Sequence, residues 1–526
     1  MNGFLVFLGF LTIILYLILK LSSKKFSYWE KKRVPYVKPV AILGNYGKYL
    51  LLQEYVGQLV QKLCQQFPNA PYFGAFYGTE PVLVVQSPEL LKHILTKDFY
   101  YFNGREISKY VTKEIITKTM FFTSGNRWKI MRQNLTPLFS SIKIKNMFYL
   151  IEKCAYDMED VLDEIISKCD VIEAKDLAAR YTMDCISSCA FGIESNTLKE
   201  PDNNSFKVMA DEIFRPSTYR GFKNNFRAVW PALFYGLGFK AFPDSIHAFF
   251  SQMMKGVFES RGYKPSTRND FVDLLLHLKE EDIITCDSLK DPKKSGLEEK
   301  VHLKVDDEVL LALCVGIFGA GFETSATTLS FTLFEFAKNP TVQKRAAEEV
   351  DDFLRRRGNK LDFECISELP YLNACVNETL RQYPVLGNLT REVMEDFTLP
   401  DGLELNKGVR VHIPVFTLHY NPEHFPQPEV YQPERFLPEN RHNIKPYTFL
   451  PYGEGPRICI GKRFSKMQII PALIAFLKKY RVELAEGMPR TVTFESRTTP
   501  IQPRKQGLML KVSQRDGWEQ RTFIRN

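Results

Sequence analysis

The chain has ten cysteines but no Cys-x-x-Cys pair, and its eight histidines form no cluster with the spacing of a zinc site. The cysteines show no paired framework, and they stand at positions 64, 154, 169, 185, 189, 286, 314, 365, 375 and 459. This pattern argues against a disulfide-stabilised secreted domain and against a dithiol redox site. We therefore expect reduced thiols in a cytosolic environment.

Motifs for nucleotides and nucleic acids are also missing. The sequence has no Rossmann fingerprint and no nucleic-acid-binding motif, although its net charge is +9 and its pI is near 8.8. We therefore predict no nucleic-acid partner, since a basic excess of this size also suits an anionic membrane surface or an acidic protein. Residues 45–510 contain no repeat and no Gly/Ser- or Pro-rich linker, so most of the 526 residues are expected to form one large domain.

One long hydrophobic run is present near the N-terminus. Phe4–Leu19 is almost entirely apolar, and with its flanks it reaches about the 18–20 residues that a membrane-spanning helix needs. Lysines and arginines follow this run rather than precede it, which is the reverse of a cleavable signal peptide and places the rest of the chain in the cytosol. We predict a transmembrane signal anchor over residues 1–21 and a basic hinge with Pro35 and Pro39 over residues 22–44.

Hydrophobic periodicity indicates a mainly α-helical chain with small β-sheets. Residues 126–355 follow a helical period for most of their length. Turn residues divide residues 72–86 into a hairpin and residues 397–416 into short strands, and residues 480–512 also resemble strands. Residues 261–308 are rich in Lys, Asp and Glu, so we expect a solvated, mobile connection there.

The most informative segment is Tyr452–Gly461 (YGEGPRICIG), where one cysteine lies in a Gly/Pro loop just before a helical stretch. A helix N-terminus and the nearby Arg457 both favour the thiolate of Cys459, and the glycines leave room for a large flat group. Such a thiolate serves as a nucleophile, a redox thiol or a metal ligand. The nearest other cysteine is Cys375, far upstream, so a haem-thiolate ligand is favoured. The alternative is a buried cysteine in a glycine-rich turn.

This loop resembles the haem-binding loop of the cytochrome P450 family, whose pattern is Phe-x-x-Gly-x-Arg-x-Cys-x-Gly. Gly455, Arg457, Cys459 and Gly461 match the pattern, and Tyr452 replaces its phenylalanine. The resemblance implies the cytochrome P450 fold and haem b whose iron is ligated by Cys459. Tyr452 keeps an aromatic ring but adds a hydroxyl, which bears on hydrogen bonding near the sulfur.

A second match follows the apolar run Val309–Phe322, whose fourteen residues favour a buried core helix over a membrane span. This run leads into Glu323 and Thr324, an acid and a hydroxyl in apolar surroundings. The sequence AGFETS at residues 320–325 resembles the family's oxygen-activation motif, in which the threonine and the acid deliver protons to dioxygen at the haem. The alternative is a helix kinked by Thr and Ser side chains that bond to the preceding turn.

A third motif is Glu378-x-x-Arg381, whose spacing places both side chains on one helix face before Pro384. Taken alone, such a pair is usually a surface ion pair of little consequence. It is similar to the family's Glu-x-x-Arg helix, where the pair bonds to an arginine of a later meander. Arg435, in Pro-Glu-Arg-Phe, fits that third position, and the resemblance implies that the three residues support the Cys459 loop.

Four residues are candidates to hold the two propionates of a haem, because buried carboxylates need paired donors. Trp128 and Arg132, in Trp-x-x-x-Arg, resemble the family's propionate clamp. Arg391, which follows Pro384 by seven residues, and Arg457 are the other two. For Trp128 and Arg132 the alternative is a tryptophan that packs between helices and a surface arginine.

The apolar stretch at residues 228–239 (AVWPALFYGLGF) has two interpretations. It is flanked by Lys223, Arg227 and Lys240, so it suits a second membrane contact beside the substrate entrance, as in microsomal relatives. It equally suits ordinary core packing. The sequence does not decide between the two.

The five motifs occur in family order, and some segments look like insect microsomal members that oxidise plant toxins and insecticides. The resemblance implies a haem-thiolate monooxygenase domain over residues 45–526, which inserts one oxygen atom from O2 into apolar substrates such as plant toxins, insecticides or endogenous lipids. Electrons would come from NADPH through a separate reductase, with a cytochrome b protein as a further donor. The expected location is the endoplasmic reticulum membrane, in a single pass, with the catalytic domain on the cytosolic face.

Docking of an acidic reductase is expected on the thiolate side. Lys462 and Arg463 follow the Cys459 loop directly, and Lys129, Lys143 and Lys145 lie in and after the clamp helix. A solvated basic surface without a partner is the alternative.

Two rival functions remain open. One is a haem-thiolate isomerase or dehydratase that rearranges peroxides without dioxygen, and the intact Glu323–Thr324 pair argues against it. The other is a haem- or lipid-binding carrier without turnover, which reductase-dependent NADPH consumption would distinguish from an enzyme.

Overall fold

Helices dominate the fold, and the computed structural model describes residues 20, 22, 24–106, 108–268, 270–290, 299–504 and 507–525. The helices are α2 (Tyr28–Lys31), α3 (Gly47–Leu50), α4 (Val56–Cys64), α5 (Pro88–Lys92), α6 (Gly125–Leu135), α7 (Ser141–Asn146), α8 (Phe148–Lys168), α9 (Ala174–Ile186), α10 (Ser205–Phe214), α11 (Thr218–Val229), α12 (Pro231–Gly236), α13 (Asp244–Ser260), α14 (Phe271–Glu281), α15 (Asp307–Gly321), α16 (Glu323–Lys338), α17 (Pro340–Arg356), α18 (Cys365–Glu368), α19 (Pro370–Gln382), α20 (Val415–His419) and α21 (Lys462–Leu477). The strands are β1 (Tyr72–Tyr77), β2 (Glu80–Val85), β3 (Val171–Glu173), β4 (Ile283–Asp287), β5 (Lys300–Lys304), β6 (Leu389–Glu392), β7 (Phe397–Thr398), β8 (Glu404–Leu405), β9 (Arg410–Ile413), β10 (Tyr480–Leu484) and β11 (Met509–Gln514). The predicted fold class, mainly α with small sheets in one large domain, is confirmed.

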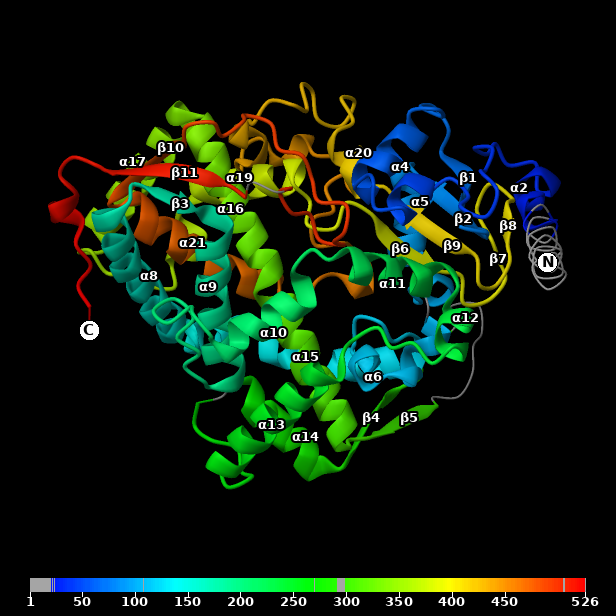
Figure 1. Ribbon diagram of the computed structural model, residues 1–526, viewed down its shortest axis with the longest axis horizontal. Coiled ribbons are helices and arrows are strands. Elements are labelled where there is room, and N and C mark those ends of the chain that lie inside the picture. Colours follow the sequence, from blue (N-terminus) through cyan, green and yellow to red (C-terminus); the bar gives the residue numbers. More distant parts are fainter. Residues whose placement is uncertain are drawn as a thin grey trace, which may run out of the picture.

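Helices α15 and α16 run one after the other through the middle of the molecule (Figure 1). The side chain of Asp306 caps α15 by accepting a hydrogen bond from the Val309 amide at 2.8 Å. Asp307–Lys338 is long and apolar enough to cross a membrane, but 67% of its most apolar 18-residue stretch is buried inside the protein. The predicted core helix over residues 309–322 is therefore confirmed.

The two larger sheets lie at opposite ends of the molecule (Figure 1). One has the strand order β1-β2-β9-β6 and the other the order β10-β11-β3. The hairpin predicted for residues 72–86 forms as expected, with Tyr72 opposite Val85 and Tyr77 opposite Glu80. Short strands also form within residues 397–416. In the described part of residues 480–512 the strands lie near the two ends, with an isolated bridge between Phe494 and Pro503.

The described part of residues 261–308 forms regular elements instead of the mobile connection that its charge predicted. Helix α14 buries an apolar face there, and strands β4 and β5 pair as an antiparallel hairpin, although residues 291–298 lie outside the described part. Arg261 holds the start of α14 through the buried carboxylates of Asp270 and Asp273, at 2.5 and 2.6 Å. Some of the charged residues of this stretch are thus used in ion pairs between elements.

The predicted anchor over residues 1–21 lies outside the described residues except for residue 20. Part of the predicted hinge over residues 22–44 is helical in α2. Its Trp29 is fully buried, and the indole N–H donates to the Ala75 carbonyl at 3.0 Å. The hinge is therefore attached to the edge strand β1.

Candidate active site

A tight loop before α21 places Cys459. The Cys459 amide donates to the Tyr452 carbonyl at 2.9 Å, which closes the loop over a 3-10 turn at Gly455–Arg457. Gly455 has φ +75°, and a Cβ there would lie 1.9 Å from the Leu95 carbonyl oxygen. The glycine at this position is therefore required by the chain itself, and not by room for a flat group.

The sulfur of Cys459 is accessible, yet its surroundings are those of an interior. The Cys459 side chain is exposed by its accessible surface area. Burial nevertheless raises the pKa of its thiol, although the Gly461 amide and Arg132 act to lower it. Both observations agree if the sulfur faces an internal space. The prediction that the helix terminus and Arg457 favour the thiolate is wrong for the bare protein, because desolvation outweighs the groups that lower the pKa of the thiol. A bound metal cation would supply the missing charge.

Four guanidinium groups gather around this space, and we call Arg105, Arg132, Arg391 and Arg457 the arginine cluster. Burial, helped by repulsion between members of the cluster, lowers the pKa of Arg105 to about 10 and that of Arg391 to about 9. Burial also lowers the pKa of Arg457, as does repulsion from the other three arginines. The Nε atoms of Arg391 and Arg457 are buried without a hydrogen-bond partner. The cluster therefore holds positive charge that the described residues do not neutralise.

Haem b fits this set of groups. Its two propionates would neutralise the arginine cluster, and the sulfur of Cys459 would ligate its iron. A haem bound in this way supplies a site where dioxygen is bound and its O–O bond is cleaved.

Helix α6 joins the clamp residues to the Cys459 loop. Arg132 donates from Nη1 to the Ile458 carbonyl at 2.8 Å. The guanidinium of Arg457 lies 4.8 Å from the ring centre of Trp128 and donates to the Thr123 carbonyl. The structure thus brings Trp128, Arg132 and Arg457 together, and places Arg391 on the neighbouring strand β6.

Arg105 is the member of the arginine cluster that the sequence did not reveal. It lies in an irregular loop after Phe102, and its Nη1 donates to the Phe121 carbonyl at 3.0 Å. Burial lowers the pKa of Arg105, and the charge of Cys459 acts in the opposite direction and raises it. No motif spacing marks this residue, so only the structure identifies it.

Glu323 and Thr324 lie where the central helix is interrupted. Helix α15 ends at Gly321 and α16 begins at Glu323, and the Thr324 hydroxyl donates to the Ala320 carbonyl at 2.9 Å. The back-bonding that was the alternative interpretation is therefore present. A Cβ at Gly321 would lie 2.5 Å from the Ile186 side chain, so close packing against α9 requires this glycine.

The carboxylate of Glu323 is buried and held by two residues that the sequence did not reveal. Lys175 Nζ lies 2.9 Å from Glu323 Oε1, and Gln502 Nε2 donates to the same oxygen at 2.7 Å. Lys175 also donates to the Thr327 hydroxyl at 3.0 Å. Because the Lys175 side chain is 15% exposed, this network joins the buried acid to the surface.

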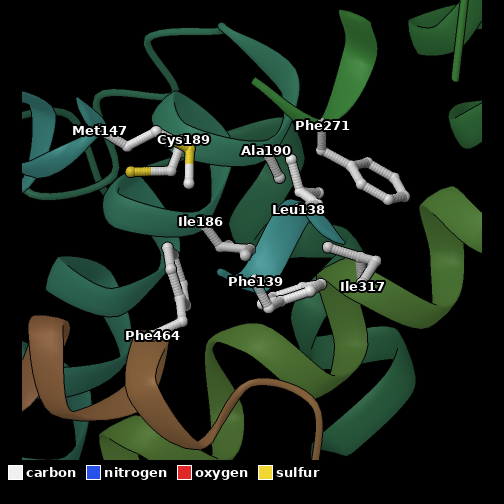
Figure 2. A pocket seen from close by; sticks show the side chains of 9 residues that line it. All are labelled: Leu138, Phe139, Met147, Ile186, Cys189, Ala190, Phe271, Ile317 and Phe464. Carbon is white, nitrogen blue, oxygen red and sulfur yellow. The ribbon is translucent and has the colours of Figure 1, made fainter. Parts of the chain in front are cut away.

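An apolar cavity lies between α21 and α15. Figure 2 shows Phe464, in the first turn of α21, and Ile317, on α15, at its edge. All of its lining residues are apolar or sulfur-bearing: Leu138, Phe139, Met147, Ile186, Cys189, Ala190, Phe271, Ile317 and Phe464. The cavity is therefore apolar, and Phe464 links it to the helix that follows the cysteine loop.

Glu378 and Arg381 form a fully buried ion pair, with Nε and Nη2 of Arg381 each 2.7 Å from one carboxylate oxygen. Arg435 brings its Nε to 3.5 Å from Glu378, and it donates to the carbonyls of Pro426 and Gln427. The structure thus brings the three predicted support residues together.

His419 connects this pair to the cysteine loop. Burial lowers its pKa to about 3, so the ring is neutral. Its Nδ1 donates to the Arg381 carbonyl at 3.0 Å, and its Nε2 accepts from the Leu450 amide at 2.9 Å. Leu450 precedes Tyr452, where the loop closes. No motif in the sequence indicates this role of His419.

The Tyr452 hydroxyl bonds away from the sulfur. It lies 2.9 Å from Ser465 Oγ, and Ser465 in turn donates to the Lys462 carbonyl at 3.0 Å. The departure from the family pattern therefore adds a hydrogen bond between the loop and the first turn of α21.

Together, the fold and the cysteine loop define a haem-thiolate protein. The sequence model of the family "Cytochrome P450" matches residues 34–509, and the chain belongs to this family. Membership implies a haem protein with monooxygenase activity and a cysteine thiolate as the iron ligand.

Among known proteins, the chain is similar to insect members of the family. It is 34% identical to "Cytochrome P450 6k1" of Blattella germanica, over 94% of each chain. It is 31% identical to "Cytochrome P450 6B2" of Helicoverpa armigera, over 93% of this chain and 94% of the relative. It is 32% identical to "Probable cytochrome P450 6a14" of Drosophila melanogaster, over 95% of this chain and 98% of the relative.

Proposed function

We propose that this protein is a membrane-anchored monooxygenase that receives electrons from NADPH through a separate reductase and oxidises apolar molecules. The observation that carries the proposal is the accessible sulfur of Cys459, which faces an internal space beside an arginine cluster without a counter-ion. The substrate class is that of plant toxins, insecticides or endogenous lipids, and a cytochrome b protein is a second electron donor. A detoxifying role is what the resemblance to insect microsomal members implies, and the similar proteins are insect members of the family.

In this proposal Cys459 ligates the iron, and the arginine cluster with Trp128 holds the propionates. Glu378, Arg381 and Arg435 keep the cysteine loop in place through the buried ion pair and its bonds to main-chain carbonyls. The catalytic domain spans residues 45–526.

Two assays test this function. The reduced protein should give the carbon-monoxide difference spectrum of a thiolate-ligated haem. With reductase and a panel of apolar substrates, it should then consume NADPH and form oxygenated products. Peroxide rearrangement without NADPH would favour an isomerase, and a thiolate spectrum without NADPH consumption for any substrate would favour a carrier.

Proton delivery is assigned to Glu323 and Thr324. The Thr324 hydroxyl is half-buried and uses its hydrogen in the bond to the Ala320 carbonyl. Its oxygen can still accept a hydrogen bond from a proton donor. Glu323 carries the acid, and its bond to Lys175 gives it a path for protons from the surface. Rotation of the carboxylate between Lys175 and the Thr324 side would move a proton inward.

Thr324→Ala should keep haem and substrate binding but uncouple NADPH consumption from product formation. We expect the product formed per NADPH to fall about tenfold or more, since a positioned proton donor contributes ~10²–10⁴-fold in rate. Measuring NADPH, product and hydrogen peroxide together checks this. Thr328→Ala is the matched control, because Thr328 makes the same kind of bond one turn later, to the Thr324 carbonyl at 3.0 Å. Equal coupling in Thr324→Ala and the wild type would contradict the assignment.

We narrow the proposed docking face for the reductase, because two of the predicted lysines are engaged in other contacts. Lys129 is part-buried and donates to the Ser288 carbonyl of the β4–β5 connection at 3.0 Å, and Lys145 pairs with Glu364 at 2.7 Å. Lys462 and Arg463, in the first turn of α21, remain the best-placed cations beside the cysteine loop. We therefore move the proposed docking contact to these two residues.

Charge reversal of Lys462 and Arg463 to glutamate should slow reductase-driven turnover, and more strongly at low salt, because screening acts over about 8–10 Å at physiological ionic strength. Peroxide-driven turnover bypasses the reductase and should change little. Lys255→Glu, on the exposed side of α13, is the control. An equal loss in both assays would indicate damage to the haem site instead of lost docking.

The proposed location is the endoplasmic reticulum membrane, with residues 1–21 as a single-pass anchor, residues 22–44 as a hinge and the catalytic domain on the cytosolic face. Large apolar side chains on and beside α11 and α12 support a second lipid contact: Tyr219, Phe222, Leu233, Leu237 and Phe239 are 43–68% exposed. Phe234 is fully buried, so the stretch at residues 228–239 also packs inward.

A further inference from the structure

A four-residue loop joins the elements that carry the arginine cluster. Asn103 Oδ1 accepts from the Gly125 amide at 2.7 Å, where α6 begins. The Gly104 carbonyl accepts from the Glu392 amide at 3.0 Å, where β6 ends. A Cβ at Gly104 would lie 2.3 Å from the sulfur of Met394, so the loop lies tightly against the sheet. The next residue, Arg105, enters the cluster.

Glu106, the residue after Arg105, is turned toward strand β9 instead. Its Oε1 lies 2.6 Å from His412 Nε2 and 3.8 Å from Arg410 Nη1. Arg410 and His412 are two residues apart on β9 and share one face of the strand. Between them, Val411 stands opposite Arg391 of β6. Glu106 is thus fixed to the sheet that also carries a member of the arginine cluster.

The hydrogen-bond roles around His412 follow from its partners. An ionised carboxylate only accepts, so His412 Nε2 donates to Glu106. The other ring nitrogen, Nδ1, lies 2.7 Å from the hydroxyl of Tyr46, which then donates to it. Tyr46 is fully buried and His412 is 2% exposed. The three side chains form one continuous hydrogen-bonded chain, which we call the Glu106 anchor.

The anchor matters because Glu106 directly follows Arg105 in the chain, so no other carboxylate is tethered as closely to this arginine. Released from the sheet, this carboxylate would be tethered beside the uncompensated guanidinium groups and would neutralise one of them. The arginine cluster would then lose part of its attraction for an external anion. Desolvated charges gain most from such a contact, and the Arg105 guanidinium is desolvated.

We propose that Tyr46, His412 and Glu106 are positioning residues that keep the Glu106 carboxylate out of the arginine cluster, so that Arg105 remains available to a haem propionate. The inference rests on the proposed role of the cluster in binding haem. It concerns how firmly the protein retains haem, and not the oxidation reaction at the haem.

The test uses the full-length haem-loaded protein and follows transfer of haem to excess apomyoglobin. His412→Leu removes the shorter of the two contacts that hold Glu106 and leaves only Arg410, 3.8 Å away, so haem release should become about tenfold faster. Glu106→Gln removes the competing charge and should leave release within about twofold of the wild type. The double variant Glu106→Gln with His412→Leu should then behave like Glu106→Gln alone. A purely structural role predicts the opposite, that the double variant is at least as defective as His412→Leu.

Two further variants separate the outcomes. Arg261→Gln breaks a buried ion pair between α13 and α14, outside the cluster, and should lower stability without changing haem release. Tyr46→Phe removes one hydroxyl from the anchor and should speed haem release less than His412→Leu does. It is the test variant if His412→Leu does not fold. Fast release from the double variant, or unchanged release from both His412→Leu and Tyr46→Phe, would overturn the inference. Unchanged release from Arg105→Gln would overturn the role of Arg105 in the cluster, and the inference with it.

Discussion

Cys459→Ala is expected to abolish oxidation completely. The sulfur of Cys459 is the accessible thiol at the internal space, whereas Cys64, Cys154, Cys185, Cys189, Cys286, Cys314, Cys365 and Cys375 are buried. Without the thiolate, an iron held there lacks the ligand whose electron density favours O–O cleavage. The reduced variant should lose the thiolate-type carbon-monoxide spectrum, and its NADPH-driven product should fall to background.

Cys169→Ala is the matched control for this prediction, because Cys169 is exposed but lies at the end of α8. It should keep the spectrum and the activity. Substrate oxidation by Cys459→Ala at the wild-type rate would contradict the assignment of the ligand.

Glu378→Leu is expected to prevent accumulation of the folded haem protein. It leaves the Arg381 guanidinium fully buried without its carboxylate partner. Removing one member of a buried pair costs ~3–5 kcal/mol, which is a large part of the ~5–15 kcal/mol by which a domain is stable. Glu378 also accepts from the Gln432 amide at 2.9 Å, so a second buried donor loses its partner. Haem content per purified chain and thermal unfolding measure the effect.

The surface pair of Arg345 with Glu434 provides the control. It has a similar N–O distance, 2.8 Å, but its side chains are 52% and 37% exposed. Glu434→Leu should therefore cost no more than about 1 kcal/mol. A Glu378→Leu protein as stable as Glu434→Leu would show that the buried pair does not maintain the fold. The double variant Glu378→Leu with Arg381→Leu should be less damaged than Glu378→Leu alone, because no unpaired charge is left buried.

The parts of the site that were predictable from the sequence are those with fixed local spacing. Cys459 in its loop, Glu378 with Arg381 on one helix face, and Trp128 with Arg132 one turn apart all carry a pattern that survives without the fold. Long-range partners carry no such pattern. Arg105 and His419 are single residues in irregular or short segments, and their roles follow only from which side chains the fold brings close.

Two expectations failed for the same physical reason, which is that burial is not visible in a local pattern. The helix terminus and Arg457 suggested a thiolate at Cys459, but desolvation raises the pKa of that thiol in the bare protein. The charged stretch at residues 261–308 suggested a solvated, mobile connection, and most of its described charged side chains are exposed, but Asp270 and Asp273 are buried and paired with Arg261. In both cases the three-dimensional surroundings decide the cost of a charge.

The uncompensated charge of the arginine cluster has a consequence for the life of the protein in a cell. A chain that has folded without its dianionic ligand keeps repelling guanidinium groups in its interior, and this repulsion lowers its free energy of unfolding. Binding of the ligand adds stability in proportion to the logarithm of ligand concentration over Kd. Newly made chains should therefore be degraded faster when the supply of haem is short, so that haem synthesis sets the amount of this protein as well as its activity.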